Sequence, residues 1–206
     1  MKITGLEPAS SKRFRVYIDG EHRLVLYQGE LSRHHLEAGS EVPEELWKRL
    51  REENIKKAKL RAMHLLNDMD RTESQLLKKL TDGGYPEDIA QEALSYVKSF
   101  GYVNDRAYIR RFAEGRMHSK SRKEIQSLLS QKGLDSAEVR EVLAEVYEEE
   151  EAEPEQEAIR ALLRKKRWKP EEMDEKEYRR MLAFFARKGF RYEDIRQVIQ
   201  LPPGNA

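Results

Sequence analysis

Alternating apolar and polar positions near the N-terminus predict a β-hairpin. Apolar side chains recur at every second position in two runs, which are Phe14, Val16 and Ile18, then Leu24 and Leu26. Asp19-Gly20 separates the runs and suits a type I′ turn, because both central residues of that turn need positive φ. Two strands alone are marginally stable in water, so we expect the hairpin in residues 13–28 to dock on another part of the chain.

A connector follows the hairpin, and helices follow the connector. Residues 29–54 gain helical character after Pro43, where Leu46, Trp47 and Leu50 fall at helical spacing. From Ile55 onward the apolar pattern is helical throughout.

Three glycines, Gly84, Gly133 and Gly189, stand where amphipathic stretches stop, and one apolar pattern surrounds all three. Apolar side chains lie eight and four residues before each glycine, directly after it, and six and ten residues beyond it. They are Leu76, Leu80, Tyr85, Ala90 and Leu94; Ile125, Leu129, Leu134, Val139 and Leu143; and Met181, Phe185, Phe190, Ile195 and Ile199. This spacing predicts a middle and a last helix in each unit, with a left-handed glycine ending the middle helix.

Capping residues support this frame. Thr72 with Gln75 and Ser121 with Glu124 have the spacing of capping boxes, twelve residues before the first and second glycines. Asp174 with Glu177 offers a similar cap fifteen residues before Gly189. The third middle helix is therefore predicted to be about one turn longer.

A first helix is expected before each middle helix. Its markers are Leu60 with Leu65, Ile109 with Phe112, and Ile159 with Leu162 and Leu163. The three glycines are 49 and 56 residues apart, a period typical of helical repeat proteins. We predict a mainly α protein: an N-terminal region, 1–54, then three tandem three-helix repeats in 55–104, 105–150 and 151–206.

Composition favours an elongated array over a thick globular core. Charged residues make up 37% of the chain and hydrophobic residues 38%, and the mean hydropathy is −0.87. The absence of cysteine excludes disulfides and thiolate chemistry. The sequence has neither the apolar core of a signal peptide nor a run of ~20 apolar residues, so we expect a cytoplasmic protein.

No residue pattern points to catalysis. The five histidines are not at metal-ligand spacing with one another or with acidic residues; they are His22, His34, His35, His64 and His118. Nucleotide-binding glycine loops and the nucleophile-elbow motif are missing. No carboxylate pair lies in an apolar stretch that would raise a pKa. We therefore expect a protein that binds rather than an enzyme, with no cofactor and no metal.

Charge is unevenly distributed although the totals nearly cancel, at 39 basic and 38 acidic residues. Between residues 106 and 132 eight basic residues face two acidic ones, a local net charge of +6. The eight are Arg106, Arg110, Arg111, Arg116, Lys120, Arg122, Lys123 and Lys132. A second basic run is Arg164, Lys165, Lys166 and Arg167. Either could be an ordinary solvated helix face, and cations at a helix end also suit its dipole; the alternative is an anionic partner.

Two further segments have a structural interpretation. Residues 145–157 hold eight acidic residues and Pro154, and we expect a solvated joint there between the second and third repeats. At the junction of the first two repeats, Gly101 should end a helix, Tyr102 should pack in the joint, and Asn104 or Asp105 should cap the next helix.

Helix–glycine–helix units also suggest a helix-turn-helix DNA reader. The helices after the glycines begin with Pro86-Glu87-Asp88, Ser136-Ala137-Glu138 and Tyr192-Glu193-Asp194. Acidic first turns repel phosphate, so base reading in the major groove is not expected.

Four motifs follow the N-terminal hairpin in order along nearly the whole chain: Arg71-Thr72-Glu73, Gly101-Tyr102-Val103-Asn104-Asp105, Gln131-Lys132-Gly133-Leu134 and Arg187-Lys188-Gly189-Phe190. In this combination and order, the hairpin and the motifs resemble the RecX family of bacterial regulators of the RecA recombinase.

The resemblance implies a curved array of repeats that binds in the groove of RecA filaments on single-stranded DNA. Such binding would impede filament extension, ATP hydrolysis and strand exchange, and so modulate recombination and the SOS response. We expect a monomer that touches DNA weakly through its basic residues. The alternatives are a single-stranded nucleic-acid-binding protein without a RecA partner, and a helical scaffold for another protein.

Overall fold

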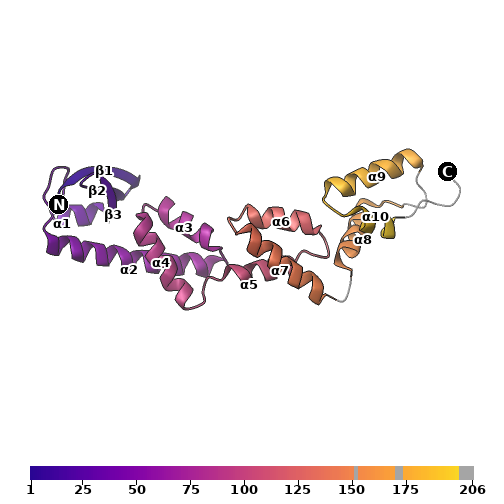
Figure 1. The fold of residues 1–206 in the computed structure, drawn as a ribbon. Helices are drawn as coiled ribbons and strands as arrows, with labels where there is room; N and C mark the ends of the chain where they lie inside the picture. The colour runs from indigo at the N-terminus through magenta and orange to yellow at the C-terminus, as the bar shows by residue number, and fades with distance from the viewer. Residues whose placement is uncertain (151–152, 170–173, 200–206) are drawn as a thin grey trace. The chain divides into compact units, whose positions relative to one another are not determined.

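The computed structural model describes residues 1–150, 153–169 and 174–199, and it divides into two compact units. The N-terminal unit, Met1–Asn104, contains β1 (Ile3–Ser10), β2 (Arg13–Ile18), β3 (Glu21–Tyr27), α1 (Gln28–Arg33), α2 (Glu44–Asp68), α3 (Glu73–Asp82) and α4 (Glu87–Ser99). The C-terminal unit, from Asp105 onward, contains α5 (Asp105–Glu114), α6 (Arg122–Ser130), α7 (Ser136–Glu149), α8 (Pro154–Lys166), α9 (Glu175–Arg187) and α10 (Tyr192–Val198). Figure 1 labels these elements.

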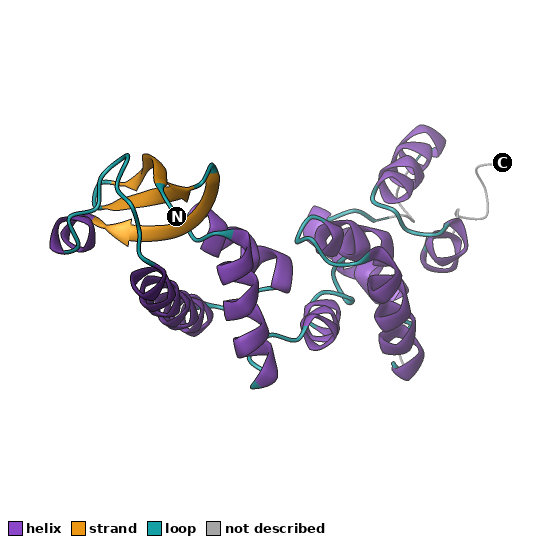
Figure 2. Ribbon diagram, turned by 60° about the vertical axis from the view of Figure 1, so that its left-hand side comes forward, coloured by secondary structure: helices purple, strands orange, loops and turns teal. Residues whose placement is uncertain are grey.

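The predicted hairpin is part of a three-stranded antiparallel sheet with the order β1-β2-β3. Figure 2 shows the strands side by side in orange. Asp19 and Gly20 have φ values of 51° and 87°, which confirms a turn with both central residues at positive φ. The prediction missed β1 because Gly5 and Pro8 interrupt its alternation.

The sheet docks on α2 through a buried polar contact. Asn54, which is fully buried, accepts a hydrogen bond from the Val25 amide at 2.9 Å and donates one to the Leu50 carbonyl at 3.1 Å. Burial of an amide side chain is tolerated here because both of its ends are bonded. The sheet and the first repeat therefore share one core.

Helix α2 is continuous over 25 residues. The expected division between residues 54 and 55 consequently falls inside a helix, which joins the predicted connector to the first repeat. Leu60 is a wrong core marker, since 58% of it is exposed. The buried stripe is Ala58, Ala62 and Leu65, and Leu60 lies two residues, or about 200°, away from Ala58 on the helix.

The repeat pattern itself is confirmed. All fifteen positions aligned on the three glycines are buried, and Gly84, Gly133 and Gly189 have φ values of 94°, 79° and 88°. The first repeat is α2–α4, the second α5–α7 and the third α8–α10. The second and third repeats each have a separate apolar core.

The predicted caps are also present. Thr72 and Gln75 form a reciprocal capping box on α3. Ser121 accepts a hydrogen bond from the Glu124 amide at 3.1 Å, and Asp174 accepts one from the Glu177 amide at 2.7 Å. Helix α9 has 13 residues against 10 in α3 and 9 in α6, which confirms the extra turn.

Candidate functional site

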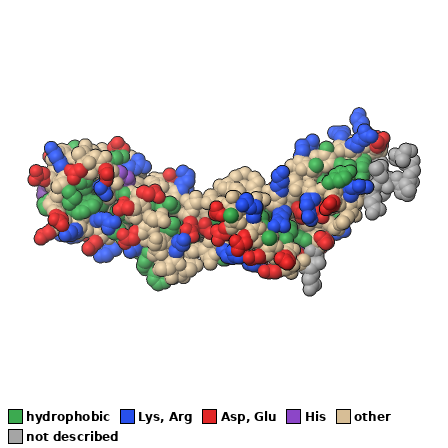
Figure 3. Space-filling view, in the orientation of Figure 1, with side chains coloured by type: hydrophobic (Ala, Val, Ile, Leu, Met, Phe, Trp, Pro, Cys, Tyr) green, Lys and Arg blue, Asp and Glu red, His purple; other side chains and the backbone are tan. Residues whose placement is uncertain are grey.

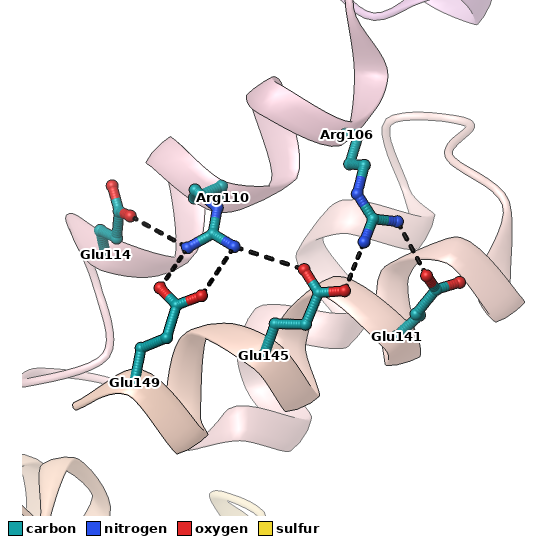
Figure 4. Close-up of polar contacts among 6 residues, drawn as sticks. All are labelled: Arg106, Arg110, Glu114, Glu141, Glu145 and Glu149. Carbon is teal, nitrogen blue, oxygen red and sulfur yellow. Dashed lines mark hydrogen bonds and ion pairs between the residues drawn. The ribbon is translucent and has the colours of Figure 1, made fainter.

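Two arginines of the predicted basic block are compensated inside the second repeat. Arg106 and Arg110 project from α5 toward the glutamates of α7, as Figure 4 shows. Arg106 bonds Glu141 at 3.0 Å and also pairs with Glu145. Arg110 approaches Glu149 at 2.6 Å, Glu145 at 3.3 Å and Glu114 at 3.9 Å. These contacts attach α5 to α7.

The pKa directions agree with this ion-pair network. The hydrogen bond to Glu141 raises the pKa of Arg106, and the bond to Glu149 raises that of Arg110. The same bond to Arg110 lowers the pKa of Glu149. The acidic joint is therefore not simply solvated, because its N-terminal glutamates neutralise part of the basic block.

Other members of the block lie against aromatic rings. The Arg116 guanidinium stacks 3.9 Å from the centre of the Phe112 ring and donates to the Phe112 carbonyl. Lys132 lies 5.7 Å from the Tyr108 ring and 5.5 Å from the Phe112 ring. These are cation–π contacts, and they fix cationic side chains on one aromatic face of the second repeat.

Residues near the start of α6 have mixed surroundings. Lys120 pairs with Glu124, and Lys188 contacts the same carboxyl. Burial raises the pKa of Glu124, but the two lysines lower it by more, so the net shift is downward. Arg122 lies over the Tyr147 ring at 5.2 Å. Lys123 and Arg111 are exposed on the surface of the second repeat.

The second basic run ends helix α8. Arg164, Lys165 and Lys166 occupy its last turn, and Arg167 follows in the left-handed conformation with φ of 54°. All four are exposed. Lys166 lies 5.1 Å from the Trp168 ring and 4.8 Å from the Phe184 ring, so this lysine is fixed next to an aromatic pair.

At the junction of the first two repeats the prediction for Tyr102 is wrong. Gly101 has the expected positive φ of 73°, but Tyr102 is 59% exposed and stacks on Phe100 with ring centres 5.8 Å apart. Val103 is the junction residue that enters the core. Asn104 precedes α5, and Asp105 is its first residue. Val103 is a better core residue than Tyr102, because it is entirely apolar and has no hydroxyl group that needs solvent or a hydrogen-bond partner.

Sequence reasoning missed the polar interface between the second and third repeats. Ser121 donates to the Lys188 carbonyl at 2.6 Å while it caps α6. Glu155, which is 7% exposed, accepts from the Arg122 amide at 3.0 Å and lies 3.4 Å from Arg191. Gly189 packs so closely that an added Cβ would lie 2.9 Å from the Lys123 Cβ.

Glu155 also contradicts the expectation of a joint with only solvated acids. Burial raises its pKa, and the neighbouring Asp194, which is 5% exposed, adds to the increase. The Arg122 amide and Arg191 oppose it. Glu155 and Asp194 are 39 residues apart in the sequence, so no local pattern could have paired them.

Neither a metal-binding cluster nor a membrane-spanning helix occurs in the described part of the chain. Across residues 1–150, 153–169 and 174–199, no three His, Asp or Glu side chains gather to hold a metal ion. None of the helices in these ranges is long and apolar enough to cross a membrane.

Comparisons with known proteins identify the relatives of the chain. Residues 58–96 match the first three-helix domain of RecX, and residues 153–199 match the third. "Regulatory protein RecX" of Caldanaerobacter subterraneus subsp. tengcongensis is 31% identical over 193 residues, 93% of this chain and 94% of that protein. The protein of the same name from Clostridium tetani is 27% identical, covering 96% of this chain and 93% of its own.

Solved structures have the same fold. A crystal structure of regulatory protein RecX covers 96% of this chain and 98% of its own, with a TM-score of 0.61 and 22% identity. RecX from Lactobacillus salivarius covers 71% of this chain and 94% of its own, with a TM-score of 0.59 and 22% identity. Because a relative with 31% identity spans nearly all of both sequences, this chain belongs to the RecX family of regulatory proteins.

Proposed function

We propose that this protein binds the RecA recombinase and RecA filaments on single-stranded DNA. It limits filament extension, ATP hydrolysis and strand exchange, and so modulates recombination, DNA repair and the SOS response. The observation that carries this proposal is the 31% identity to a regulatory protein RecX along nearly the whole chain. We place its action in the cytoplasm, as a monomer without catalytic activity of its own.

The surface of the C-terminal unit suits a partner that combines protein and phosphate. Lys123, Arg164, Lys165 and Arg167 are exposed, and no ion-pair partner for them occurs among the residues that the structure describes. Arg106 and Arg110, in contrast, are held by α7. We therefore propose that the first four carry more of any phosphate contact than the arginines of α5.

The test is ATP hydrolysis by RecA on single-stranded DNA, titrated with this protein. We expect inhibition that saturates as the protein covers the filament. Charge reversal at Lys123, Arg164, Lys165 and Arg167 should weaken it and flatten its salt dependence. Unchanged inhibition by this quadruple variant, shown to be folded by circular dichroism, would contradict the assignment of these residues.

A second candidate function is binding of single-stranded nucleic acid without RecA. The cations held beside aromatic rings favour it, because stacking and phosphate contact together are the usual basis of such binding. Oligonucleotide binding with no effect on RecA would support this alternative.

A further inference from the structure

Helix α9 carries a groove that the basic runs of the sequence do not reveal. A hollow of about 440 Å³ between the end of α8 and α9 is lined by Lys166, Trp168 and Arg180, among others. A second hollow of about 490 Å³ extends to Lys123 at the start of α6. Phe184 and Arg187 line both, so the two hollows form one groove, called here the α9 groove.

The groove is cationic. Lys123, Arg180 and Arg187 are exposed, and within the described ranges none of them has an ion-pair partner. Two carboxylates also line the groove. Glu124 is neutralised by Lys120 and Lys188, and Glu177 lies in the first turn of α9. Figure 3 shows Lys and Arg side chains around apolar ones on the third repeat.

Aromatic rings lie between these charges. Trp168 is half-buried and packs edge-to-face on Phe184, with ring centres 5.2 Å apart and planes at 84°. Trp168 also packs edge-to-face on the buried Phe185, and both contacts fix the indole. Lys166 lies within 5.1 Å of the Trp168 ring.

We infer that the α9 groove binds single-stranded nucleic acid, with phosphates on Arg180, Arg187 and Lys123 and bases against Trp168 and Phe184. Alternating cations and fixed rings match the alternating phosphates and bases of an unpaired strand. An acidic peptide could use the cations but has no base to stack on the indole. In a duplex the base faces are already stacked, so a single strand is preferred. The inference locates the nucleic-acid contact of the proposed function in one groove, and it rests on that function only for its role in the cell.

Two variants each remove two positive charges, one pair inside the groove and one pair outside it. Arg180→Gln with Arg187→Gln removes two cations from the groove. Arg160→Gln with Arg179→Gln removes two cations of α8 and α9 that line neither hollow. Arg160 bonds Gln156, and Arg179 pairs with Glu175. The probe is fluorescein-labelled oligothymidylate of about 15 nucleotides, followed by anisotropy without RecA.

We expect the groove variant to bind about 25-fold more weakly at 0.1 M salt, and its salt slope to fall by about 1.4, because each single-strand phosphate contact contributes ~0.7 to that slope. The control variant should stay within about twofold of the parent protein. Equal losses in the two variants would overturn the inference, because they would indicate attraction to net charge alone.

Tryptophan fluorescence tests stacking without disturbing the groove. The chain has two tryptophans, and Trp47→Phe leaves Trp168 as the only one. Oligothymidylate should quench Trp168, and polyglutamate should not. Because polyglutamate can pair with the cations but cannot stack, it should displace the oligonucleotide only at a large excess of charge. Binding without quenching, or displacement by an equal amount of polyglutamate charge, would overturn the inference. Oligonucleotide binding without RecA inhibition would instead refute the proposed function, and RecA inhibition without quenching would refute only the groove.

Discussion

Replacing Gly189 with alanine tests the close contact between the second and third repeats. Gly189 has φ of 88°, and an added Cβ would lie 2.9 Å from the Lys123 Cβ and 3.1 Å from the Ser121 hydroxyl. Real Cβ atoms essentially never approach another atom to 2.9 Å, so either α6 or the end of α9 must move. Ser121 is also bonded to the Lys188 carbonyl, so the movement would disturb that contact.

The magnitude follows from two contributions. A left-handed conformation costs a residue with a Cβ about 1–2 kcal/mol. Overpacking of a close contact adds about 1–3 kcal/mol. Gly101 is the matched control, because its φ is 73° and nothing lies within 4 Å of its added Cβ. Gly189→Ala should therefore lose about 1–3 kcal/mol more than Gly101→Ala.

In guanidinium unfolding, the fluorescence of a single tryptophan reports the unit in which that tryptophan lies. Trp168 packs in the third repeat and Trp47 against the core of the N-terminal unit. Gly189→Ala is measured in a Trp47→Phe background, and Gly101→Ala in a Trp168→Phe background. Equal losses of unfolding free energy in the two variants would refute the contact between α6 and the end of α9.

Three further predictions concern the polar contacts. Glu145→Gln with Glu149→Gln should strengthen oligonucleotide binding, because Arg106 loses Glu145 and Arg110 loses both Glu145 and Glu149 as ion-pair partners. The Tm should change little because these pairs are largely exposed, and weaker binding in anisotropy would contradict the prediction. Thr72→Ala should lower the unfolding free energy of the N-terminal unit by about 1 kcal/mol in urea, and Thr72→Ser by much less, because only alanine removes the capping hydroxyl. Equal losses in the two variants would contradict the capping role of Thr72. Folding raises the pKa of Glu155 above 4.5, so its protonated form contributes stability that is present below pH 4.5 and is lost as pH rises through the folded pKa. Glu155→Gln should flatten this decline of the unfolding free energy in urea unfolding. An unchanged pH profile would contradict the prediction.

Local patterns predicted the repeats well because each repeat follows local rules. The spacing around Gly84, Gly133 and Gly189 depends on helix periodicity and on one conformation that glycine adopts easily. The caps at Thr72 and Asp174 depend on residues three positions apart. β1 was not predicted because Gly5 and Pro8 interrupt its alternation of apolar and polar residues. The strand is stabilised by its antiparallel pairing with β2, which no local pattern shows.

The candidate site was harder to predict, because charge counts do not give ion-pair partners. The basic block was visible in the sequence, but Glu145 and Glu149 lie 35 and 39 residues after Arg110. The α9 groove combines Lys123 with residues about 60 positions later. Only the packing of α6 against the end of α9 brings them together.

Regulation of RecA is tested by the rate of RecA-catalysed ATP hydrolysis on single-stranded DNA, measured while this protein is titrated to equivalence with RecA. We expect progressive inhibition, weakened by charge reversal at Lys123, Arg164, Lys165 and Arg167. An ATPase rate that stays constant up to stoichiometric protein would contradict the proposed function and leave the fold and the family assignment intact.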